Sequence, residues 1–568
     1  MLKIKSSVAE AVLDEIKKAA PQTELDAGEV AAMLEYPPDP SMGDLALPCF
    51  KLSKIMRRSP VQIAETIAAG LSSPCLKKAE TVNGYLNMYI SDACLSSDVL
   101  EKALEKGDKY GAPSFGAGKT VVLDYSSPNV AKPFHIGHLG TTVIGHSLKK
   151  LHQFAGYKCI GINYLGDWGT QFGKLIVAYR KWGSIDEIEK GGVDKLVELY
   201  VKFHNEAEND KTLEDEARAE FTKLEHGDKE NHDLWRKFVD ISLREYEKTY
   251  KLLGIDFDSY KGESFYTDKM PAQVEILREK GLLKIDDGAS IVDLSAYNMP
   301  PCLILKRDGS TLYPTRDIAA AVYRKKEYNF DKAIYVTSAG QSLHFAQWFK
   351  VVELMGYDWY DELVHVPYGT VSINGEKLAT RTGNVILLRD LFALAIDKVM
   401  GIINERNPDL ENKEKVAEEV GVGAIIFYYL SNNRMRDINF VMEDALSFDG
   451  NTGPYVQYAY ARTCSILAKE QPGDGEDKIT TDEERALLKA ISLFEEKVCE
   501  AIDQYEPSVI ARYILDVAVA FNRFYHGCRI LSEEDADIKN TRLRITKAAQ
   551  TVLGSAFELI CLKKTEKI

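Results

Sequence analysis

The sequence predicts an α/β protein of several domains, organised around a doubly wound parallel sheet. A strand–helix–strand pattern spans residues 121–164, a second strand–loop–helix unit follows at 331–355, and helical periodicity continues from about residue 390 to the end. At 568 residues the chain is too long for one hydrophobic core. We therefore expect a Rossmann-like parallel-sheet domain, preceded by an N-terminal α/β domain and followed by a C-terminal all-α helical bundle.

Residues 1–112 form the expected N-terminal domain. It begins with an amphipathic helix, and a second helix is expected at 61–69, after a basic cluster that comprises Lys51, Lys54, Arg57 and Arg58. This cluster is either a solvated face or a phosphate contact. Residues 81–90 alternate like one strand, with an exposed face formed by Asn83, Tyr85, Asn87 and Tyr89. That face suits an unstacked base, although the polar outer face of a half-buried strand is the commoner structure.

Residues 118–395 form the expected parallel-sheet domain, reached through a glycine-rich linker at 111–118. Its first unit is a strand at 121–125, a helix that ends near Gly156 and a strand at 158–164. The GxGxxG fingerprint is absent, which favours a mononucleotide over a dinucleotide. The charge-dense segment of about 182–250 predicts a helical insertion. The sheet resumes with a strand at 331–337 and a helix at 344–355.

Two histidines stand three residues apart where the first strand leads into a helix. His135 and His138 share one face of the first helical turn, whose free backbone N–H groups favour an anion. Gly137 between them allows a ring or sugar to approach the backbone closely. The spacing predicts a nucleotide-phosphate site, and the alternative is a pair of solvent-facing capping residues.

A second helix start is expected just before residue 316. Thr315 can cap this helix, and Asp317 then either complements the helix dipole or binds a cationic ligand. After a basic loop at 371–383, residues 396–568 form the helical domain. Its helices are expected near 390–403, 413–430, 443–470, 481–503, 507–531 and 540–561.

Composition narrows the possible classes of protein. The net charge of −15 argues against general adhesion to nucleic acid, without excluding a local RNA groove. Nine cysteines without any CxxC or Cys/His cluster indicate neither disulfides nor a zinc site. No apolar run is long enough to span a membrane, and the N-terminus lacks a signal peptide, so a cytoplasmic location is expected.

Taken together, the motifs resemble those of the class I aminoacyl-tRNA synthetases, and most closely the arginyl-tRNA synthetases. The two most distinctive segments are SSPNVAKPFHIGHL at 126–139 and NYLGDWGTQFGKL at 163–175. LYPTRD (312–317), QSLHFAQ (341–347) and GPYVQYAYAR (453–462) match as well. The resemblance covers nearly the whole chain, and these segments together are highly specific.

The resemblance implies a role for each matching residue. The residues that match the ATP-phosphate motif are His135, Gly137 and His138. Positions that hold the amino-acid end of arginine correspond to Ser127, Asn129 and Gln341, and those that hold its guanidinium to Asp124, Tyr313 and Asp317. Carboxylates and an aromatic ring suit a planar cation with five donors. The resemblance also implies tRNA-elbow contacts at Tyr85 and Asn87, and an anticodon-binding domain in which we expect Arg512 to contact tRNA.

The chain departs from the family pattern at two places. Residues 377–381 read Lys-Leu-Ala-Thr-Arg where the class signature is Lys-Met-Ser-Lys-Ser, so Thr380 replaces the second lysine. Lys132, just before the histidine motif, is expected to supply the missing cation near the leaving pyrophosphate. The expected catalytic set is then His135, His138, Lys132, Lys377 and Arg381. Gly140 stands where the family usually has arginine.

The implied reaction joins L-arginine to its tRNA with ATP, after tRNA has bound. ATP acts as its Mg²⁺ complex, without a tightly bound cofactor or a protein metal site. The implied partners are arginine tRNA, L-arginine and ATP, with no DNA and no membrane, and the protein is expected to be a monomer. A non-catalytic tRNA-binding paralogue would have lost the histidines, and a small-molecule nucleotidyltransferase would lack the helical domain and the acidic pocket.

Overall fold

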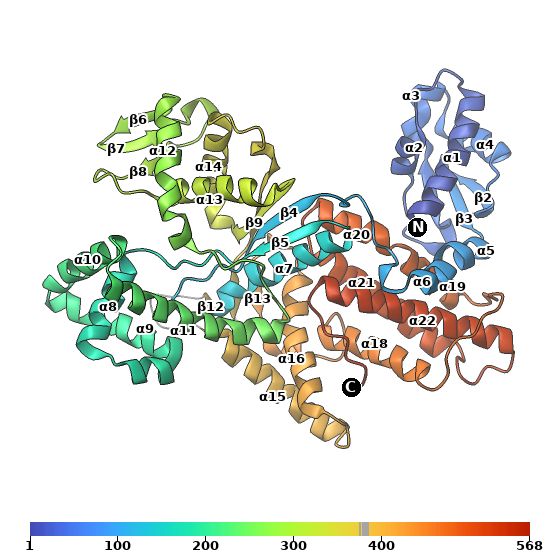
Figure 1. Cartoon of the computed structure of the whole chain (residues 1–568). Helices are drawn as coiled ribbons and strands as arrows, with labels where there is room; N and C mark the ends of the chain where they lie inside the picture. The colour runs from blue at the N-terminus through green and yellow to red at the C-terminus, as the bar shows by residue number, and fades with distance from the viewer. Residues whose placement is uncertain (374–375, 378–385) are drawn as a thin grey trace.

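The computed structural model describes residues 1–373, 376–377 and 386–568 (Figure 1). Its centre is a four-stranded parallel sheet in the order β10-β9-β4-β5. The strands are β4 (Thr120–Asp124), β5 (Lys158–Ile162), β9 (Lys332–Ser338) and β10 (Leu363–Tyr368). Residues 121–123 are almost completely buried because helices cover both faces of the sheet. The parallel sheet expected from the sequence is confirmed.

Each half of this sheet carries its crossover helix. α7 (Leu139–Phe154) connects β4 to β5, and α14 (Ser342–Leu354) connects β9 to β10. The segment of about 182–250, where an insertion was expected, is helical and comprises α9 (Ile185–Asn209), α10 (Thr212–Glu225) and α11 (Lys229–Leu253), which follow α8 (Thr170–Trp182). It has a hydrophobic core of its own, and it forms a separate lobe in Figure 1.

A small antiparallel sheet that the sequence analysis did not predict follows the insertion. It has the order β6-β7-β8 and comprises β6 (Leu283–Asp286), β7 (Ala289–Val292) and β8 (Cys302–Leu305). The helices beside it are α12 (Met270–Glu279) and α13 (Tyr313–Tyr328). The prediction that Thr315 caps a helix is wrong. α13 begins at Tyr313 with Pro314 in its first turn, and the Thr315 hydroxyl donates to the Ile304 carbonyl at 2.6 Å.

The N-terminal domain packs helices against a three-stranded antiparallel sheet. The strands have the order β1-β3-β2 and are β1 (Leu45–Pro48), β2 (Leu76–Val82) and β3 (Tyr85–Ile90). The helices are α1 (Leu2–Ala19), α2 (Ala27–Met33), α3 (Ser53–Met56), α4 (Pro60–Gly70), α5 (Asp92–Leu95) and α6 (Lys102–Lys106).

Two expectations for this domain are wrong. Residues 81–90 are not one strand, because Asn83 and Gly84 turn the chain with φ of 52° and 85° between β2 and β3. Asn87 is only 6% exposed because β3 is the central strand of the sheet, whereas Tyr85 is exposed at its end.

A disulfide is present where none was expected. Cys75 and Cys94 are 19 residues apart, and the bridge fastens the start of β2 to α5. The remaining seven cysteines are free. Sequence spacing gave no signal for this pair, since β2, β3 and the chain reversal between them bring the two residues together.

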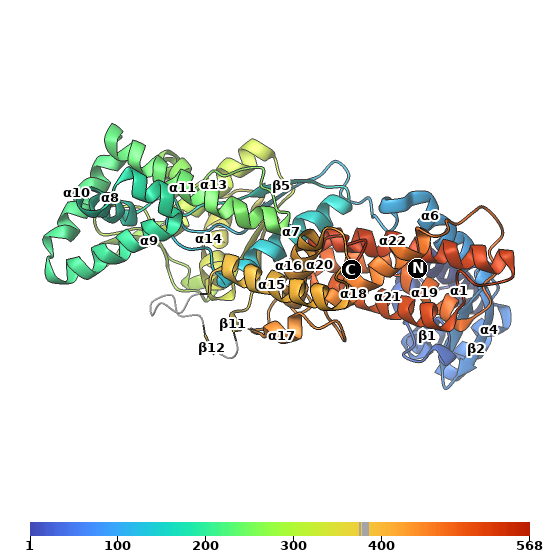
Figure 2. The same ribbon diagram turned by 90° about the horizontal axis from the view of Figure 1, so that it is seen from below.

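The helical domain packs against α7 and extends away from the parallel sheet (Figure 2). Its helices are α15 (Leu388–Arg406), α16 (Lys413–Leu430), α17 (Met442–Ala445), α18 (Gly453–Leu467), α19 (Asp482–Ser492), α20 (Phe494–Asp503), α21 (Ser508–Gly527) and α22 (Ala536–Leu559). The Ser147 hydroxyl of α7 donates to the Leu559 carbonyl of α22 at 2.6 Å. The helix that follows the two histidines is thereby bonded to the helical domain.

The expected helices of this region are confirmed with two breaks. The expected helix at 443–470 is α17 and α18 separated by a loop, and the helix expected at 481–503 breaks at Leu493. A short strand, β13 (Ile438–Phe440), pairs in parallel with β11 (Val371–Ile373), which also pairs with β12 (Glu376–Lys377). The expected boundary at residue 395 lies inside α15.

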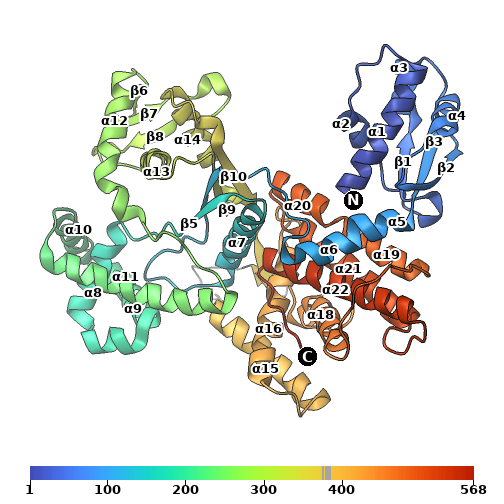
Figure 3. The ribbon, with the colours of Figure 1, turned by 45° about the vertical axis from the view of Figure 1, so that its right-hand side comes forward.

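The N-terminal domain rests on the helical domain (Figure 3). Arg485 of α19 crosses between them, with Nη2 2.8 Å from the Asp44 carboxylate. Among the described residues, no helix is both long and apolar enough to cross a membrane.

Candidate active site

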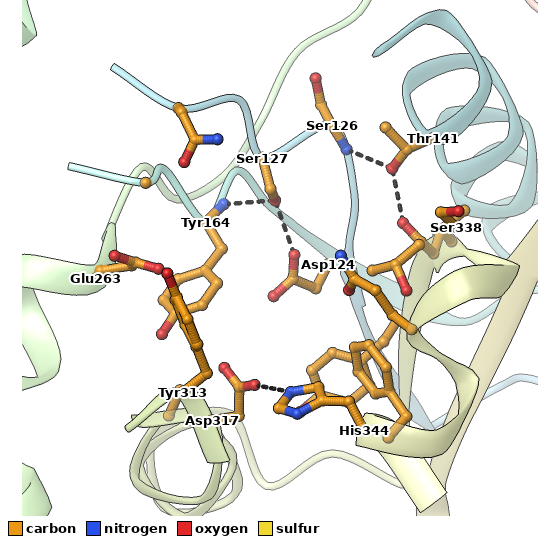
Figure 4. A pocket seen from close by; sticks show the side chains of 18 of the residues that line it. Asp124, Ser126, Ser127, Thr141, Tyr164, Glu263, Tyr313, Asp317, Ser338 and His344 are labelled. Atoms are coloured by element: carbon orange, nitrogen blue, oxygen red, sulfur yellow. Dashed lines mark hydrogen bonds and ion pairs between the residues drawn. The ribbon is translucent and has the colours of Figure 1, made fainter. Parts of the chain in front are cut away.

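A cavity of about 560 Å³ opens at the carboxyl ends of β4, β5 and β9 (Figure 4). Its lining includes every residue that the sequence analysis assigned to arginine: Asp124, Ser127, Asn129, Tyr313, Asp317 and Gln341. His138 lies on the same wall. Separate segments therefore bring the predicted arginine residues together with His138, whereas His135 and Gly137 of the phosphate motif are not among the residues that line the cavity.

The loop after β4 is held in a conformation that L-residues rarely adopt. Three of its non-glycine residues have positive φ: Ser126 at 69°, Ser127 at 49° and Ala131 at 58°. α11 fixes this loop, since the Tyr246 hydroxyl lies 2.7 Å from the carbonyls of both Asn129 and Lys132. The helical insertion thus supports the histidine loop, a role that its charge-dense sequence did not reveal.

Hydrogen bonds fix the orientation of both histidine rings. Nδ1 of His135 accepts the Gly137 N–H at 3.1 Å, and Nδ1 of His138 accepts the His135 N–H at 3.2 Å. Because Nδ1 is an acceptor in each ring, the proton of a neutral ring is on Nε2. Burial is the main cause that lowers the pKa of His138 to about 3, and it also lowers the pKa of His135 with help from Lys132. Both rings are therefore neutral donors at pH 7.

Of the remaining predicted cations, one lies on the histidine loop, one belongs to a short strand, and one lies outside the described residues. Lys132 is exposed, and its charge acts on His135. The segment after residue 385 pairs with the same loop, since Leu388 N–H donates to the Phe134 carbonyl at 3.0 Å. Thr380 and Arg381 lie outside the described residues, and Lys377 belongs to β12.

The two acids predicted to bind a guanidinium have different surroundings. Asp124 is buried, with its Oδ2 2.8 Å from Nη1 of Arg324 and its Oδ1 accepting the Ser127 hydroxyl at 2.9 Å. Asp317 is one turn inside α13, and its Oδ2 lies 2.6 Å from Nε2 of His344. Figure 4 shows both carboxylates on the wall of the cavity.

The other predicted arginine residues lie around these acids. Tyr313 is 66% exposed at the start of α13, and Gln341 is exposed at the end of the short turn after β9. Asn129 is exposed beside Gly166, where its Oδ1 occupies the position that a Cβ would need. The Ser127 hydroxyl also accepts the Tyr164 N–H at 3.0 Å. It therefore holds two groups in place, the loop after β5 and the Asp124 carboxylate.

Sequence analysis missed a third acid in the cavity. Glu263 follows the insertion in a region for which no element was predicted, and its Oε2 lies 2.6 Å from Nη1 of Arg316. Burial raises the pKa of Glu263 to about 7, although Arg316 opposes that rise. Its position beside the cavity depends on a contact between distant segments, since its N–H donates to the Leu165 carbonyl at 2.9 Å, and this contact has no local sequence signal.

The residues predicted to contact tRNA lie elsewhere. Tyr85 is exposed and meets Phe50 edge to face, with ring centroids 5.5 Å apart. Arg512 lines a second cavity, of about 590 Å³, on the helical domain together with Arg523 and Asn451. Asn87 is buried in β3, so it does not share an exposed face with Tyr85 as the sequence analysis predicted.

The geometry indicates two adjoining functions, one within the first cavity and one at the histidine turn that borders it through His138. The acidic wall of the cavity suits a cation, whereas the N-terminus of α7 and the two Nε2–H donors suit the phosphates of a nucleotide. A site of this kind can bring the carboxylate of a cationic amino acid to a nucleotide phosphate.

Family models match most of the chain. Residues 99–442 match the catalytic domain of class I tRNA synthetases of the arginine type, described as "tRNA synthetases class I (R), catalytic domain". Residues 456–568 match the DALR anticodon binding domain, and residues 6–90 match the arginyl tRNA synthetase N terminal domain.

Relatives are similar to the chain over nearly their full length. The chain is 49% identical to the arginine–tRNA ligase of Clostridium beijerinckii over 567 residues, which covers 99% of this chain and 100% of the relative. It is 50% identical to that of Clostridium perfringens, over 96% of this chain and 97% of the relative. The arginyl-tRNA synthetase structure of Thermus thermophilus superposes with a TM-score of 0.82 at 25% identity, over 98% of this chain and 99% of that one. The chain therefore belongs to the arginyl-tRNA synthetases, a family of class I aminoacyl-tRNA synthetases.

Proposed function

We propose that the protein is an arginine–tRNA ligase that works in two steps. L-Arginine and ATP give arginyl-adenylate and pyrophosphate, and the arginyl group then moves to the 2′-hydroxyl of the terminal adenosine of its tRNA. The observation that carries this proposal is the cavity that combines three carboxylates with His138 at the start of α7.

The acidic wall of the cavity selects arginine. Asp124, Tyr313 and Asp317 bind its guanidinium, because two carboxylates from β4 and α13 can accept different N–H groups while a ring lies against the plane. The amino and carboxylate groups of the substrate are held near the histidines by Ser127, Asn129 and Gln341. A lysine ammonium lacks the planar fork that these acceptors fit.

The first step is an in-line displacement at phosphorus. An oxygen of the arginine carboxylate attacks the α-phosphorus, the bond from that phosphorus to the bridging oxygen breaks, and pyrophosphate leaves. The Nε2–H groups of His135 and His138 donate to phosphate oxygens as charge shifts towards the leaving group, and Gly137 allows the nucleotide to approach the backbone. Lys132, Lys377 and Arg381 neutralise the pyrophosphate.

Magnesium enters as part of the ATP substrate. Each carboxylate of the cavity already faces a basic partner, as in the Asp124–Arg324, Asp317–His344 and Glu263–Arg316 pairs. Within the described residues, the one cluster with ligands close enough to share a metal ion is Cys75, Cys94 and Asp98, and its cysteines are disulfide-bonded. Since Mg²⁺ favours oxygen ligands and keeps contact with substrate phosphates, ATP itself would carry the ion.

The second step engages the other domains. The 2′-hydroxyl oxygen attacks the adenylate carbonyl, AMP leaves, and the hydroxyl proton is lost. Residues 1–112 contact the tRNA elbow, with exposed Tyr85 as the main contact and Asn87 as a support within the same strand. Residues 118–395 carry the chemistry, and 396–568 contact the anticodon through the Arg512 cavity. We further propose a cytoplasmic monomer that uses tRNA and not DNA.

One exchange experiment tests this function. Isotope exchange between pyrophosphate and ATP is measured with each of the twenty amino acids, with and without bulk tRNA. We expect a signal with arginine only, and only when tRNA is present. Exchange with another amino acid at a similar rate would contradict the arginine assignment, and exchange without tRNA would contradict the requirement for tRNA. Tyr85→Ala and Arg512→Ala should raise the KM for tRNA without changing the KM for arginine.

A further inference from the structure

A buried cation lies at the inner end of the arginine cavity. Arg324 of α13 is 1% exposed, and its Nη1 is 2.8 Å from Oδ2 of Asp124. Its Cζ lies 5.0 Å from the ring centroid of Tyr164 and 5.7 Å from that of Tyr335. A guanidinium enclosed by rings on the floor of a binding cavity is costly to bury, so its presence there calls for a reason.

Packing alone does not provide that reason. Among the residues that the structure describes, Nε and Nη2 of Arg324 have no hydrogen-bond partner, and the Tyr164 and Tyr335 hydroxyls have none either. A side chain placed for stability would satisfy more of its five donors. Its one ion-pair partner is the Asp124 carboxylate, which faces the cavity. The arrangement therefore serves Asp124.

Asp124 would be a poor acceptor without this cation. Burial raises its pKa, nearby Asp317 raises it further, and Arg324 is the strongest of the groups that lower it. The other titratable groups around the Arg324–Asp124 pair are Tyr164, Tyr266 and Tyr335, which are neutral near pH 7. The Ser127 hydroxyl and Arg324 each bind one oxygen of Asp124, so together they fix the plane of the carboxylate.

We infer that Arg324 is a positioning residue of the arginine pocket, which holds the Asp124 carboxylate in place as an acceptor for the substrate guanidinium. The inference rests on the proposed assignment of this cavity to arginine. It adds that the protein uses a guanidinium of its own, bound to one side of Asp124, to prepare the other side for the guanidinium of the substrate.

The test uses Arg324→Met, Arg324→Lys and a matched control. Lys149 is equally buried, and its Nζ is 2.9 Å from Oδ2 of Asp258 in the same domain, but it does not line the cavity. Lys149→Met therefore removes a buried cation from its ion pair with the more exposed Asp258, without touching the pocket. Aminoacylation kinetics from pH 6 to 8.5 give the KM values for arginine and ATP, and thermal denaturation gives Tm for each variant.

For Arg324→Met we expect the KM for arginine at pH 7 to rise by about tenfold or more, with the KM for ATP within about twofold of the wild-type value. The ratio of variant to wild-type KM should grow as pH falls, because Asp124 then takes up a proton in the variant first. Glu263 titrates in the variant and in the wild type alike, so dividing one KM by the other removes its contribution to the pH dependence. Arg324→Lys should show a smaller rise and a flat ratio, since it restores the charge without the planar fork.

Lys149→Met should lower Tm and leave the KM for arginine unchanged. The inference is overturned if Arg324→Met keeps the wild-type KM for arginine, or if it changes both KM values together as a general loss of structure would. If Arg324→Met does not fold, Arg324→Lys decides, because an unchanged arginine KM in that variant also overturns the inference. Asp317→Asn separates the two proposals: if it too leaves the arginine KM unchanged, the assignment of the pocket is wrong.

Discussion

The orientation of the His138 ring gives a prediction about which replacement preserves catalysis. Nδ1 of His138 accepts the His135 N–H at 3.2 Å, so Nε2–H is the group available to ATP. Glutamine places its amide nitrogen near the position of Nε2, whereas asparagine places its nitrogen near Nδ1. His138→Gln should therefore keep the donor to phosphate, and His138→Asn should lose it.

The size of the difference follows from the kind of bond involved. A hydrogen bond to a charged group contributes about 1.5–3 kcal/mol, and loss of a donor to a developing oxyanion costs about 100- to 1,000-fold in rate. We expect His138→Asn to reduce the rate of adenylate formation by about 100-fold or more, and His138→Gln by about tenfold or less. The assay is tRNA-dependent pyrophosphate exchange at saturating arginine and ATP.

The pH dependence gives a second readout from the same pair of variants. Because burial lowers the pKa of His138 to about 3, the ring stays neutral from pH 6 to 8.5, and the ratio of wild-type to His138→Gln rates should be constant in that range. A histidine with a depressed pKa in the folded state destabilises the fold as pH falls below its unfolded value of about 6.5. Wild-type Tm should therefore fall relative to that of His138→Gln between pH 6.5 and 4. Greater activity of the asparagine variant would refute the ring orientation, and a rate ratio that titrates near pH 6.5 would refute the neutral ring.

Three further predictions follow from other residues. Lys132→Ala should lower kcat about 10- to 100-fold with an unchanged arginine KM, because an exposed cation near the leaving group acts in the transition state. The control variant Lys119→Ala, at the opposite end of β4, should have no effect. A near-normal kcat of Lys132→Ala would exclude the proposed role. Glu263→Gln should gain stability over wild type as pH rises from 6 to 8, since a carboxyl whose pKa is raised to about 7 destabilises the fold when it ionises; equal Tm differences at both pH values would contradict this. Gly140→Ala should lower the free energy of unfolding by about 1–3 kcal/mol, because the added Cβ would lie 2.2 Å from the Tyr429 hydroxyl. Denaturant unfolding measures this loss, and the double variant that also carries Tyr429→Leu should recover part of it.

Features encoded by neighbouring residues were predictable from the sequence. The strand, loop and helix around the two histidines depend on local periodicity, and the structure confirms β4, α7 and β5. Position 140 shows the limit of local sequence patterns. The sequence indicated only that glycine replaces the usual arginine, and the structure shows that Tyr429, 289 positions later, fills the space beside it.

Pairings between distant segments could not be predicted in the same way. Arg324 lies 200 residues after Asp124, so nothing local shows that the two side chains meet. Glu263 likewise contacts residues that are distant in the sequence, and the Cys75–Cys94 disulfide depends on the turn between β2 and β3. The turn at Asn83 is different, since Asn-Gly is a strong local signal for a hairpin, and the alternation on both sides of it obscured that signal.

Carboxylates in the cavity select the substrate guanidinium in the mechanism proposed above, and Asp317→Asn is the sharpest test of that selection. Citrulline has nearly the shape of arginine but carries no charge. In tRNA-dependent pyrophosphate exchange, wild type should use arginine and not citrulline. The Asp317→Asn variant should show an arginine KM raised by about thirtyfold or more, with the KM for ATP unchanged. A wild-type KM for arginine in that variant would contradict the account.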